Sequence, residues 1–518
     1  MQCIVRMSER RSGIVGVWAL ASLAGVGCLD RELVEVPPAV ESVVSVRIAT
    51  AGSANVDLLV LVDNSNSMRE EQTNLTANFG ALVGALVDPP DEDGDGNDDW
   101  NAVHSLHVGV ISSDMGTSGY PITTCDGAER GDDGVLQNLP GEGLAGCEAT
   151  YDKYLTFEGE SDDGTPGDDP ARIIRDFGCI ADLGTGGCGF EQQLYAVEKA
   201  IGVHSASGAA NDGFLREDAI LAILVVTDEE DCSISDPGIF GDDDSLGPLN
   251  LRCFENPEMV RPVSEFVSAA LASKAGHPDR VVVAAIAGVP QDLVELSDVQ
   301  LASDDVMTRD DYEGILADPR MIQTIDYSAA GGGNQLVPSC DVPGMGVAFP
   351  PRRIVEWIRD AEFDGASGVV QSICQRDWQP TMRAISRLIG GVLGGACLAR
   401  QIAGPGGVPL ATGEHADCVV REELEHNGPC PAGRFEVDVT PDGNTICQVC
   451  QAGDGEDPYL VDSIGTSLAA CTDSVANWFY TTEDDDCEGR GKVQFTAGYE
   501  PEPGSVVDLQ CLSNTGGE

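Results

Sequence analysis

Residues 56–68 read Val-Asp-Leu-Leu-Val-Leu-Val-Asp-Asn-Ser-Asn-Ser-Met. Within them, residues 58–62 are five apolar residues in a row without polar alternation, which is typical of a strand buried on both faces of a parallel sheet. Apolar residues at helical spacing come next, so a helix is predicted after the strand. Asp63, Ser65 and Ser67 therefore lie on a turn between the carboxyl end of a strand and a helix, where open α/β sheets bind ligands.

The oxygen atoms of these three side chains are hard donors of the kind that Mg²⁺ prefers. The same residue types also favour ordinary turns and helix caps, so the turn by itself leaves both interpretations open. A second strand of the same kind, residues 219–226, ends at Thr227-Asp228. Two buried strands that each end in an aspartate place two carboxylates at one edge of a parallel sheet, which favours the metal site.

Asp63-x-Ser65-x-Ser67 after one buried strand, with Thr227-Asp228 after a later one, resembles the metal-ion-dependent adhesion site of von Willebrand factor A domains. The resemblance implies a doubly wound, mostly parallel α/β sheet with helices on both faces. It also implies that Asp63, Ser65, Ser67 and Asp228 hold Mg²⁺, or Mn²⁺ or Ca²⁺ in its place. One coordination position of the cation would stay open for a carboxylate of a protein ligand, since a hard cation prefers oxygen ligands.

The glycine-rich residues 184–189 precede a further predicted helix, which carries Leu194. Von Willebrand A domains have a Gly-Gly-Thr turn here, six residues before a helical leucine, and its threonine completes the metal site. Counting back from Leu194 places Cys188 at that position, and Thr185 is the nearest hydroxyl. Either the loop is rebuilt around a Cys179–Cys188 disulfide so that Thr185 supplies the third contact, or the third contact is absent.

A second candidate metal site lies in the acidic residues 91–99. Its candidate ligands are Asp91, Asp93, Asp95, Asn97 and Asp99. The Asp-x-Asp-x-Asp-Gly pattern resembles the calcium loops of EF-hand and thrombospondin type 3 modules, although Ala102 stands where an EF-hand has its bidentate acid. We expect a Ca²⁺-bound loop rather than a solvated acidic hairpin, because six acidic groups in nine residues repel one another unless a cation neutralises them.

Predicted strands and helices alternate up to residue 396, which indicates a parallel sheet covered on both faces. Besides those already described, the predicted strands are 106–111, 280–286 and 369–373, with a possible edge strand at 151–157, and the predicted helices include 257–273 and 378–392. We expect a tether over 29–53, a von Willebrand A-like domain with insertions over 54–396, and a small disulfide-rich, mainly β module over 397–518.

The N-terminus is typical of a targeting segment. Three arginines precede an apolar stretch, residues 14–26, that is too short to span a bilayer. The stretch ends at Gly27-Cys28 and resembles a bacterial lipobox, in which the cysteine is acylated, although Gly25 stands where leucine is usual. Residues 1–28 are therefore predicted to be a signal peptide with lipidation at Cys28, and a plain secretory signal is the alternative. Both predict an exported, cell-envelope protein, held by an outer-membrane lipid anchor or secreted.

Sixteen cysteines remain when Cys3 and Cys28 are set aside, and an even number in an exported protein predicts disulfides. Short separations favour pairing Cys125 with Cys147, Cys179 with Cys188, and Cys232 with Cys253. Cys447-x-x-Cys450 leaves half of a zinc site as a minor alternative, with Cys418 and Cys430 as the other half.

The charge balance restricts the partners. Asp and Glu number 87 against 29 Lys and Arg, a formal charge of −58, so nucleic acid is excluded as a partner by repulsion. The usual catalytic signatures, such as His-Glu-x-x-His, Gly-x-Ser-x-Gly and the Walker loop, do not occur in the sequence. We therefore expect a non-enzymatic, adhesion or scaffolding protein that binds a protein ligand through its cation. The alternatives are a metal-dependent hydrolase of the envelope and a purely structural protein stapled by metals and disulfides.

Overall fold

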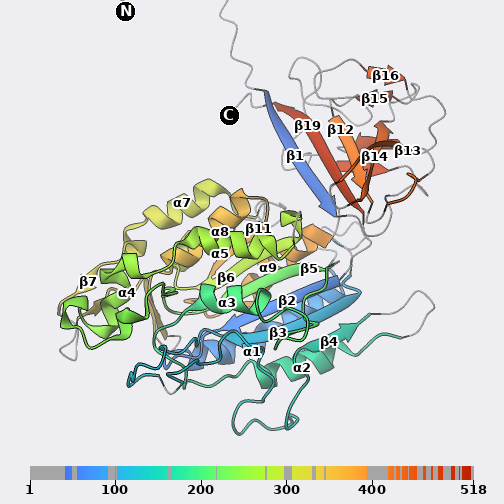
Figure 1. The fold of residues 1–518 in the computed structure, drawn as a ribbon. Helices are drawn as coiled ribbons and strands as arrows, with labels where there is room; N and C mark the ends of the chain where they lie inside the picture. The colour runs from blue at the N-terminus through green and yellow to red at the C-terminus, as the bar shows by residue number, and fades with distance from the viewer. Residues whose placement is uncertain are drawn as a thin grey trace, which may run out of the picture. The chain divides into compact units, whose positions relative to one another are not determined.

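The computed structural model shows an α/β domain and a separate β-sheet (Figure 1). It describes residues 41–514 except 50–54, 91–99, 101, 126, 160–165, 218, 275–276, 297–305, 329–333, 344–345, 394–417, 425–426, 432–433, 441–442, 452–458, 462–467, 471–476, 482–491, 496–500 and 502–504. The predicted lipidation site at Cys28 and the predicted calcium loop of residues 91–99 lie outside this part of the chain. None of the helices within it is long and apolar enough to cross a membrane.

The α/β domain is built on a six-stranded sheet in the order β11-β6-β5-β2-β3-β4. Its strands are β2 (Asn55–Val62), β3 (Ser105–Ser112), β4 (Leu155–Glu158), β5 (Ile220–Val226), β6 (Val281–Ala287) and β11 (Ser367–Ser372). All neighbours pair in parallel except β4, which runs antiparallel to β3 at one edge. The predicted mostly parallel sheet is confirmed, and the edge strand predicted at 151–157 is present but begins only at Leu155.

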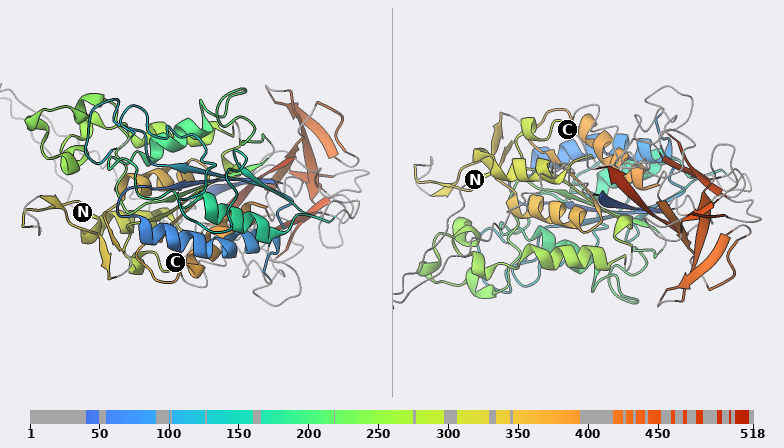
Figure 2. Two further views of the ribbon diagram at one scale, coloured as in Figure 1. Left: turned by 90° about the horizontal axis from the view of Figure 1, so that it is seen from below. Right: turned by 90° about the horizontal axis from the view of Figure 1, so that it is seen from above.

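Helices cover both faces of this sheet (Figure 2). On one face lie α1 (Arg69–Val87), α2 (Pro170–Ile180) and α9 (Gln379–Leu393); on the other lie α3 (Gln193–Ile201), α5 (Val263–Ala272) and α8 (Arg352–Phe363), with α7 (Arg309–Ala317) beside α8. The helix predicted for 257–273 is shorter than expected, since Pro262 stands directly before α5 and residues 257–259 form a separate 3-10 turn. Proline lacks the N–H that a longer helix would need at that position.

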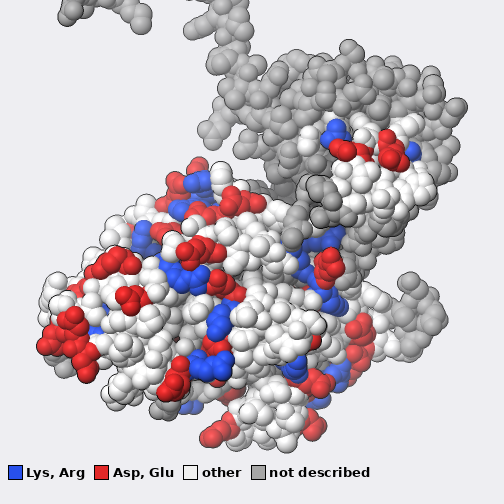
Figure 3. Space-filling view, viewed as in Figure 1, with Lys and Arg blue, Asp and Glu red and all other residues white. Residues whose placement is uncertain are grey.

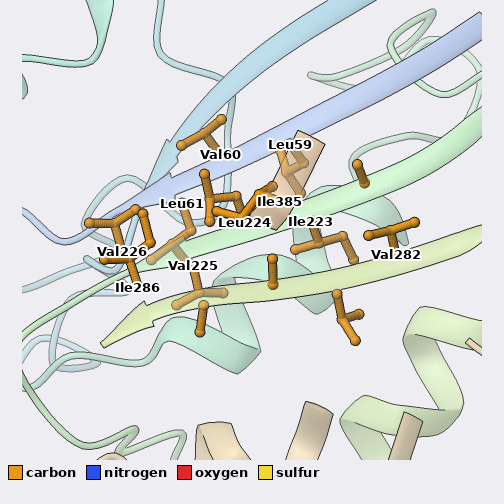
Figure 4. Close-up of a cluster of buried hydrophobic side chains, with 14 of the residues drawn as sticks. Leu59, Val60, Leu61, Ile223, Leu224, Val225, Val226, Val282, Ile286 and Ile385 are labelled. Atoms are coloured by element: carbon orange, nitrogen blue, oxygen red, sulfur yellow. The ribbon is translucent and has the colours of Figure 1, made fainter. Parts of the chain in front are cut away.

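The central strands have unbroken apolar sequences because both of their faces lie in the core. Every residue of β5 is buried, as are residues 56–62 of β2, because helices pack against both sides of the sheet. Figure 4 shows their side chains interleaved with those of β6 and with Ile385 of α9. At roughly 25 cal/mol per Å² of apolar surface, the burial of these side chains on both faces of the sheet stabilises the domain.

Strand order reverses between β2 and β5. The chain runs outward from β2 through β3 to β4, and from β5 through β6 to β11 on the other side. Val62 and Val226 are register partners, and the backbone N–H of Asp63 donates to the carbonyl of Val226 across 3.0 Å. The turns that carry Asp63 and Asp228 therefore leave the sheet side by side at the switch point, where ligand crevices form in such folds.

Short elements extend the domain beyond the carboxyl ends of the strands. They comprise α4 (Arg252–Glu255), the hairpin of β7 (Ile325–Asp326) with β8 (Gln335–Leu336), and the hairpin of β9 (Cys340–Val342) with β10 (Gly346–Ala348). The amide of Phe349, just after β10, donates to the carbonyl of Asp228. These insertions therefore shape the surroundings of the switch point.

The second sheet follows the order β1-β19-β12-β14-β15-β16, and β13, β17 and β18 attach through β14 and β17. Its strands are β1 (Glu41–Ala49), β12 (Cys418–Glu423), β13 (Arg434–Val439), β14 (Thr445–Gln451), β15 (Tyr459–Val461), β16 (Leu468–Ala470), β17 (Asn477–Thr481), β18 (Lys492–Phe495) and β19 (Val506–Asn514). The prediction of a tether over 29–53 is wrong for β1, which pairs antiparallel with β19 from Glu41↔Asn514 to Ala49↔Val506. The α/β domain is thus inserted between the first strand of this sheet and the others.

The disulfides correct two predicted pairings. Cys125 pairs with Cys188 and Cys147 with Cys179, while the predicted Cys232–Cys253 bridge is confirmed. Pairing by sequence proximity failed because the segment after β3 folds back across the glycine-rich loop, where the amide of Gly189 donates to the carbonyl of Thr124. Cys340 and Cys374 form a further bridge.

The zinc alternative for the second sheet is also wrong. Cys430 is bonded to Cys447, and Cys418 and Cys450 are disulfide-bonded as well. A cysteine in a disulfide offers no thiolate, so none of these four can serve as a zinc ligand in this state.

Candidate functional site

Asp63 is fully buried at the end of β2, and its carboxylate is held from three sides. Oδ1 accepts from the amide of Ser65 at 2.8 Å and from the hydroxyl of Ser113 at 3.2 Å, and Oδ2 accepts from the hydroxyl of Thr227 at 2.6 Å. A carboxylate has about four acceptor positions, so one position on Oδ2 is left for a cation. Ser113 comes directly after β3, so the end of this strand contributes to the same crevice.

The two predicted serines lie together at the opening of the turn. Their Oγ atoms are 3.2 Å apart, with Ser65 buried and Ser67 exposed. Hydroxyls at this spacing offer two neutral oxygen donors to one cation without adding charge.

Asp228 follows β5 and is 1% exposed, yet neither of its carboxylate oxygens has a hydrogen-bond partner among the described residues. Burial, and then the charge of Asp63, hold the pKa of Asp228 well above its ordinary value. The hydroxyl of Ser67 lies near enough to oppose this rise, although its geometry falls outside that of a hydrogen bond. A buried carboxylate without a partner is costly unless a cation or a proton neutralises it.

Three further buried oxygens around these aspartates lack a partner among the described residues: Oδ1 of Asn64, Oε2 of Glu71 and Oε1 of Gln193. Glu71 lies in the first turn of α1, and Gln193, at the start of α3, donates through Nε2 to the hydroxyl of Thr227. Native proteins leave few buried polar atoms unpaired, so four residues with such atoms at one end of two strands make this end of the sheet a candidate ligand site.

Neighbouring carboxylates add to the negative potential. Burial raises the pKa of Glu71 to about 7, with smaller contributions from Glu70 and Asp63. Burial and the charges of Asp63 and Asp228 also raise the pKa values of Glu191 and Glu229 well above the ordinary value. A divalent cation would relieve all of these repulsions at once.

Thr185, the candidate for the third contact, is hydrogen-bonded to a cationic side chain of the same chain. Its hydroxyl accepts from the guanidinium of Arg69 at 3.2 Å, so a cation at this oxygen would face a positive charge. The glycine-rich loop is tied to the site by Gln72, whose Nε2 donates both to the carbonyl of Asp63 and to that of Gly184. Cys188, at the position where the threonine was sought, is buried in its disulfide with Cys125.

Among the described residues, one set of three potential metal-ligating groups lies within 4.8 Å of one another, Asp114 with Cys125 and Cys188. The two cysteines are bonded to each other, and Oδ1 of Asp114 accepts from the amide of Gly116 in a local turn. In the oxidised protein this set therefore offers a single carboxylate. Because the acidic groups at Asp63 and Asp228 are not part of so dense a set, a cation there would also depend on hydroxyls and water, as Mg²⁺ commonly does.

A cavity of about 580 Å³ opens beside these residues, a size within the range of ligand sites. Ser65 and Ser67 form part of its lining, together with Glu191 and Glu229. Residues of α4 and β8 close it on the far side. Figure 3 shows acidic side chains gathered at this end of the α/β domain, beside α4 and β7.

The sequence did not point to Glu71, Glu191 or Gln193. Glu71 and Gln193 each lie in the first turn of a helix, at positions where polar residues are common, and no spacing singled them out. Their role arises only when α1, α3 and the two central strands come together in the fold.

Comparisons with known proteins identify no family. No family model matches the chain, and no curated protein matches it. Among solved structures it is similar to proximal thread matrix protein 1 from the mussel byssus, crystal form 2, at 14% identity and a TM-score of 0.21. The match covers 47% of this chain and 39% of that one, and at this TM-score it carries no weight for fold or function.

Proposed function

We propose that the chain is a von Willebrand A-like, metal-dependent binding protein. Its α/β domain would hold a divalent cation, Mg²⁺ by preference, through Asp63, Ser65, Ser67 and Asp228. A carboxylate of a protein ligand would complete the coordination. The doubly wound, mostly parallel sheet with Asp63 and Asp228 at its switch point supports this assignment.

The buried, unpartnered carboxylate of Asp228 is the observation that carries the proposal. Asp228 lies beside the equally buried Asp63, and two bare carboxylates in one desolvated site repel each other. Oxygen donors of this kind fit Mg²⁺, Mn²⁺ or Ca²⁺ rather than a soft metal.

The residues have separate tasks in this account. Thr227 and Ser113 orient the Asp63 carboxylate, and Ser65 and Ser67 present neutral oxygens toward the cavity. When bound, the cation supplies a Lewis-acidic position that attracts a carboxylate oxygen. Because the serines add no charge, the two aspartates balance a divalent ion without blocking an anionic ligand.

We propose that the protein carries out this function after export from the cytoplasm. The signal-like N-terminus, the disulfides and the charge of −58 support a cell-envelope protein anchored by a lipid on Cys28. Such a protein would meet its ligand outside the cytoplasm.

Titration calorimetry of the folded chain with Mg²⁺, Mn²⁺ and Ca²⁺ tests the proposal. Asp63→Ala should lose binding at the α/β site, and Asp152→Ala, which removes an equally charged but exposed side chain, should bind as the wild type does. Circular dichroism of both variants checks that the fold is kept. Equal binding by Asp63→Ala and the wild type would place the ion elsewhere, for example at the acidic residues 91–99, and would overturn the proposal.

A further inference from the structure

The cavity beside the candidate cation site adjoins it directly. The hydroxyl-bearing residues Ser65 and Ser67 line the cavity, so a ligand group bound at the cation would continue into it. Its volume of about 580 Å³ exceeds what one carboxylate needs. The remaining lining residues therefore indicate which other chemical groups the ligand has.

One part of the lining is apolar. It includes Ile122, Phe190, Phe254 and Val260, of which Ile122 and Phe190 are buried. Phe190 packs edge-on against Phe240 at 5.0 Å between ring centroids, which holds its ring in place. Such a floor suits the methylene stem of a ligand, because burying each CH₂ group is favourable by about 0.8 kcal/mol.

The other part is acidic. Five carboxylate residues line the cavity against two arginines. Both arginines already interact with other groups of the chain. Arg352 donates to the carbonyls of Leu316 and Met321. Arg353 forms an ion pair with Asp231. These pairings leave the cavity with an excess of negative charge.

Two of the acidic residues have no partner to offset them. Glu191 is only 8% exposed, and no other described residue forms a hydrogen bond or ion pair with the side chain of Glu191 or of Glu229. A buried carboxylate that points into a cavity without a partner favours a ligand that brings a positive charge. Glu356 on α8 is another of the five carboxylate residues in the lining.

We infer that the ligand carries a carboxylate and a cationic group joined by an apolar stem, as a lysine with a nearby carboxylate does. This inference rests on the proposed function, since the carboxylate is taken by the cation site. The stem lies on the floor of Ile122 and Phe190, and the cationic group pairs with the acidic lining. The cavity lining thus determines which ligands bind, whereas the cation binds the carboxylate that all of them share.

Calorimetry of the wild-type chain with saturating Mg²⁺ tests the inference with three probes: 6-aminohexanoate, hexanoate and 1-aminohexane. We expect 6-aminohexanoate to bind at least about tenfold more tightly than either other probe, because a charge-assisted hydrogen bond typically contributes a step of this size. A series of shorter and longer ω-amino acids would show which stem length spans the two groups. Removing Mg²⁺ should weaken the binding of the amino acids and of hexanoate, whose carboxylates contact the cation. It should not weaken the binding of 1-aminohexane, which has no carboxylate.

Matched variants test the acidic lining of the cavity separately from the cation site. Glu229→Gln and Glu356→Gln should reduce the preference for 6-aminohexanoate over hexanoate, while Glu217→Gln, an exposed residue next to Arg216 at the opposite end of β2, should preserve it. If Mg²⁺ binds but 6-aminohexanoate and hexanoate bind equally, the cavity inference falls and the proposed function stands. If no cation binds at the α/β site, both fall.

Discussion

The hydroxyl of Thr227 donates to Oδ2 of Asp63 across 2.6 Å, which joins the ends of the two central strands. The same hydroxyl accepts from Nε2 of Gln193, so α3 is tied to the switch point through Thr227. The threonine thus fixes the carboxylate that, in our account, holds the cation. Its position between a buried donor and a buried acceptor makes it sensitive to substitution.

Thr227→Val tests this link, since valine keeps the shape of threonine and removes the hydroxyl. Oδ2 of Asp63 and Nε2 of Gln193 would both lose their partner, so we expect the free energy of unfolding to fall by about 1–3 kcal/mol. We also expect weaker Mg²⁺ binding, because the carboxylate is no longer oriented. Urea denaturation and calorimetry measure the two effects, and Thr227→Ser, which keeps the hydroxyl, should lie close to the wild type. An unchanged Mg²⁺ affinity in Thr227→Val would contradict the orienting role.

The carboxylates predict a definite pH dependence. In the cation-free protein the pKa of Glu71 is about 7 and that of Asp228 is well above its ordinary value, so both are raised relative to the unfolded chain. Between the unfolded and folded values, the folded state binds more protons, and the free energy of unfolding therefore falls as pH rises. Protons compete with a cation for the same oxygens.

Saturating Mg²⁺ should consequently raise the melting temperature more at about pH 8 than at about pH 5.5. Differential scanning calorimetry at both pH values measures this difference. An equal rise at both values would mean that the bound ion does not compete with these protons.

A buried ion pair at the other end of β2 allows stability to be tested apart from the site. Asp57 is fully buried and accepts from Nε of Arg216 at 2.7 Å, with Lys274 at 4.0 Å. Asp57→Ala would leave these cations without their carboxylate, and we expect a loss of about 3 kcal/mol in the free energy of unfolding by urea denaturation. The Mg²⁺ affinity of the folded variant should not change; a loss of affinity would show that the two ends of β2 are coupled.

The N-terminal prediction is tested by mass spectrometry of the chain expressed in a bacterium that processes lipoproteins. We expect a diacylglyceryl group on Cys28, which would become the mature N-terminus. Cys28→Ser should then be released from the membrane fraction. An unmodified N-terminus at another residue would leave a simple secretory signal.

The sequence predicted the sheet and the two aspartates because both signals are local. A strand buried on both faces is recognisable as an apolar run in the sequence. Asp63 follows such a run directly, and Asp228 follows the other after Thr227. The neighbouring position of the two turns then follows from the parallel register of β2 and β5.

The features that sequence reasoning missed all depend on contacts between distant segments. β1 pairs with β19 at the far end of the chain, and nothing near residue 41 signals that partner. The Cys125–Cys188 bridge depends on how the loop after β3 folds over the glycine-rich loop. Glu191 joins the site for a similar reason, because the loop that carries it lines the same cavity as the turn after β2.

Diffraction from crystals grown with Mn²⁺ tests the central claim most directly, because the anomalous signal locates the ion. We expect a peak within about 2.0–2.6 Å of Oγ of Ser65, Oγ of Ser67 and an oxygen of Asp63, the range for hard cations and oxygen ligands. Asp228 should contact the ion directly or through one water. A peak confined to residues 91–99, or none at the carboxyl ends of β2 and β5, would contradict it.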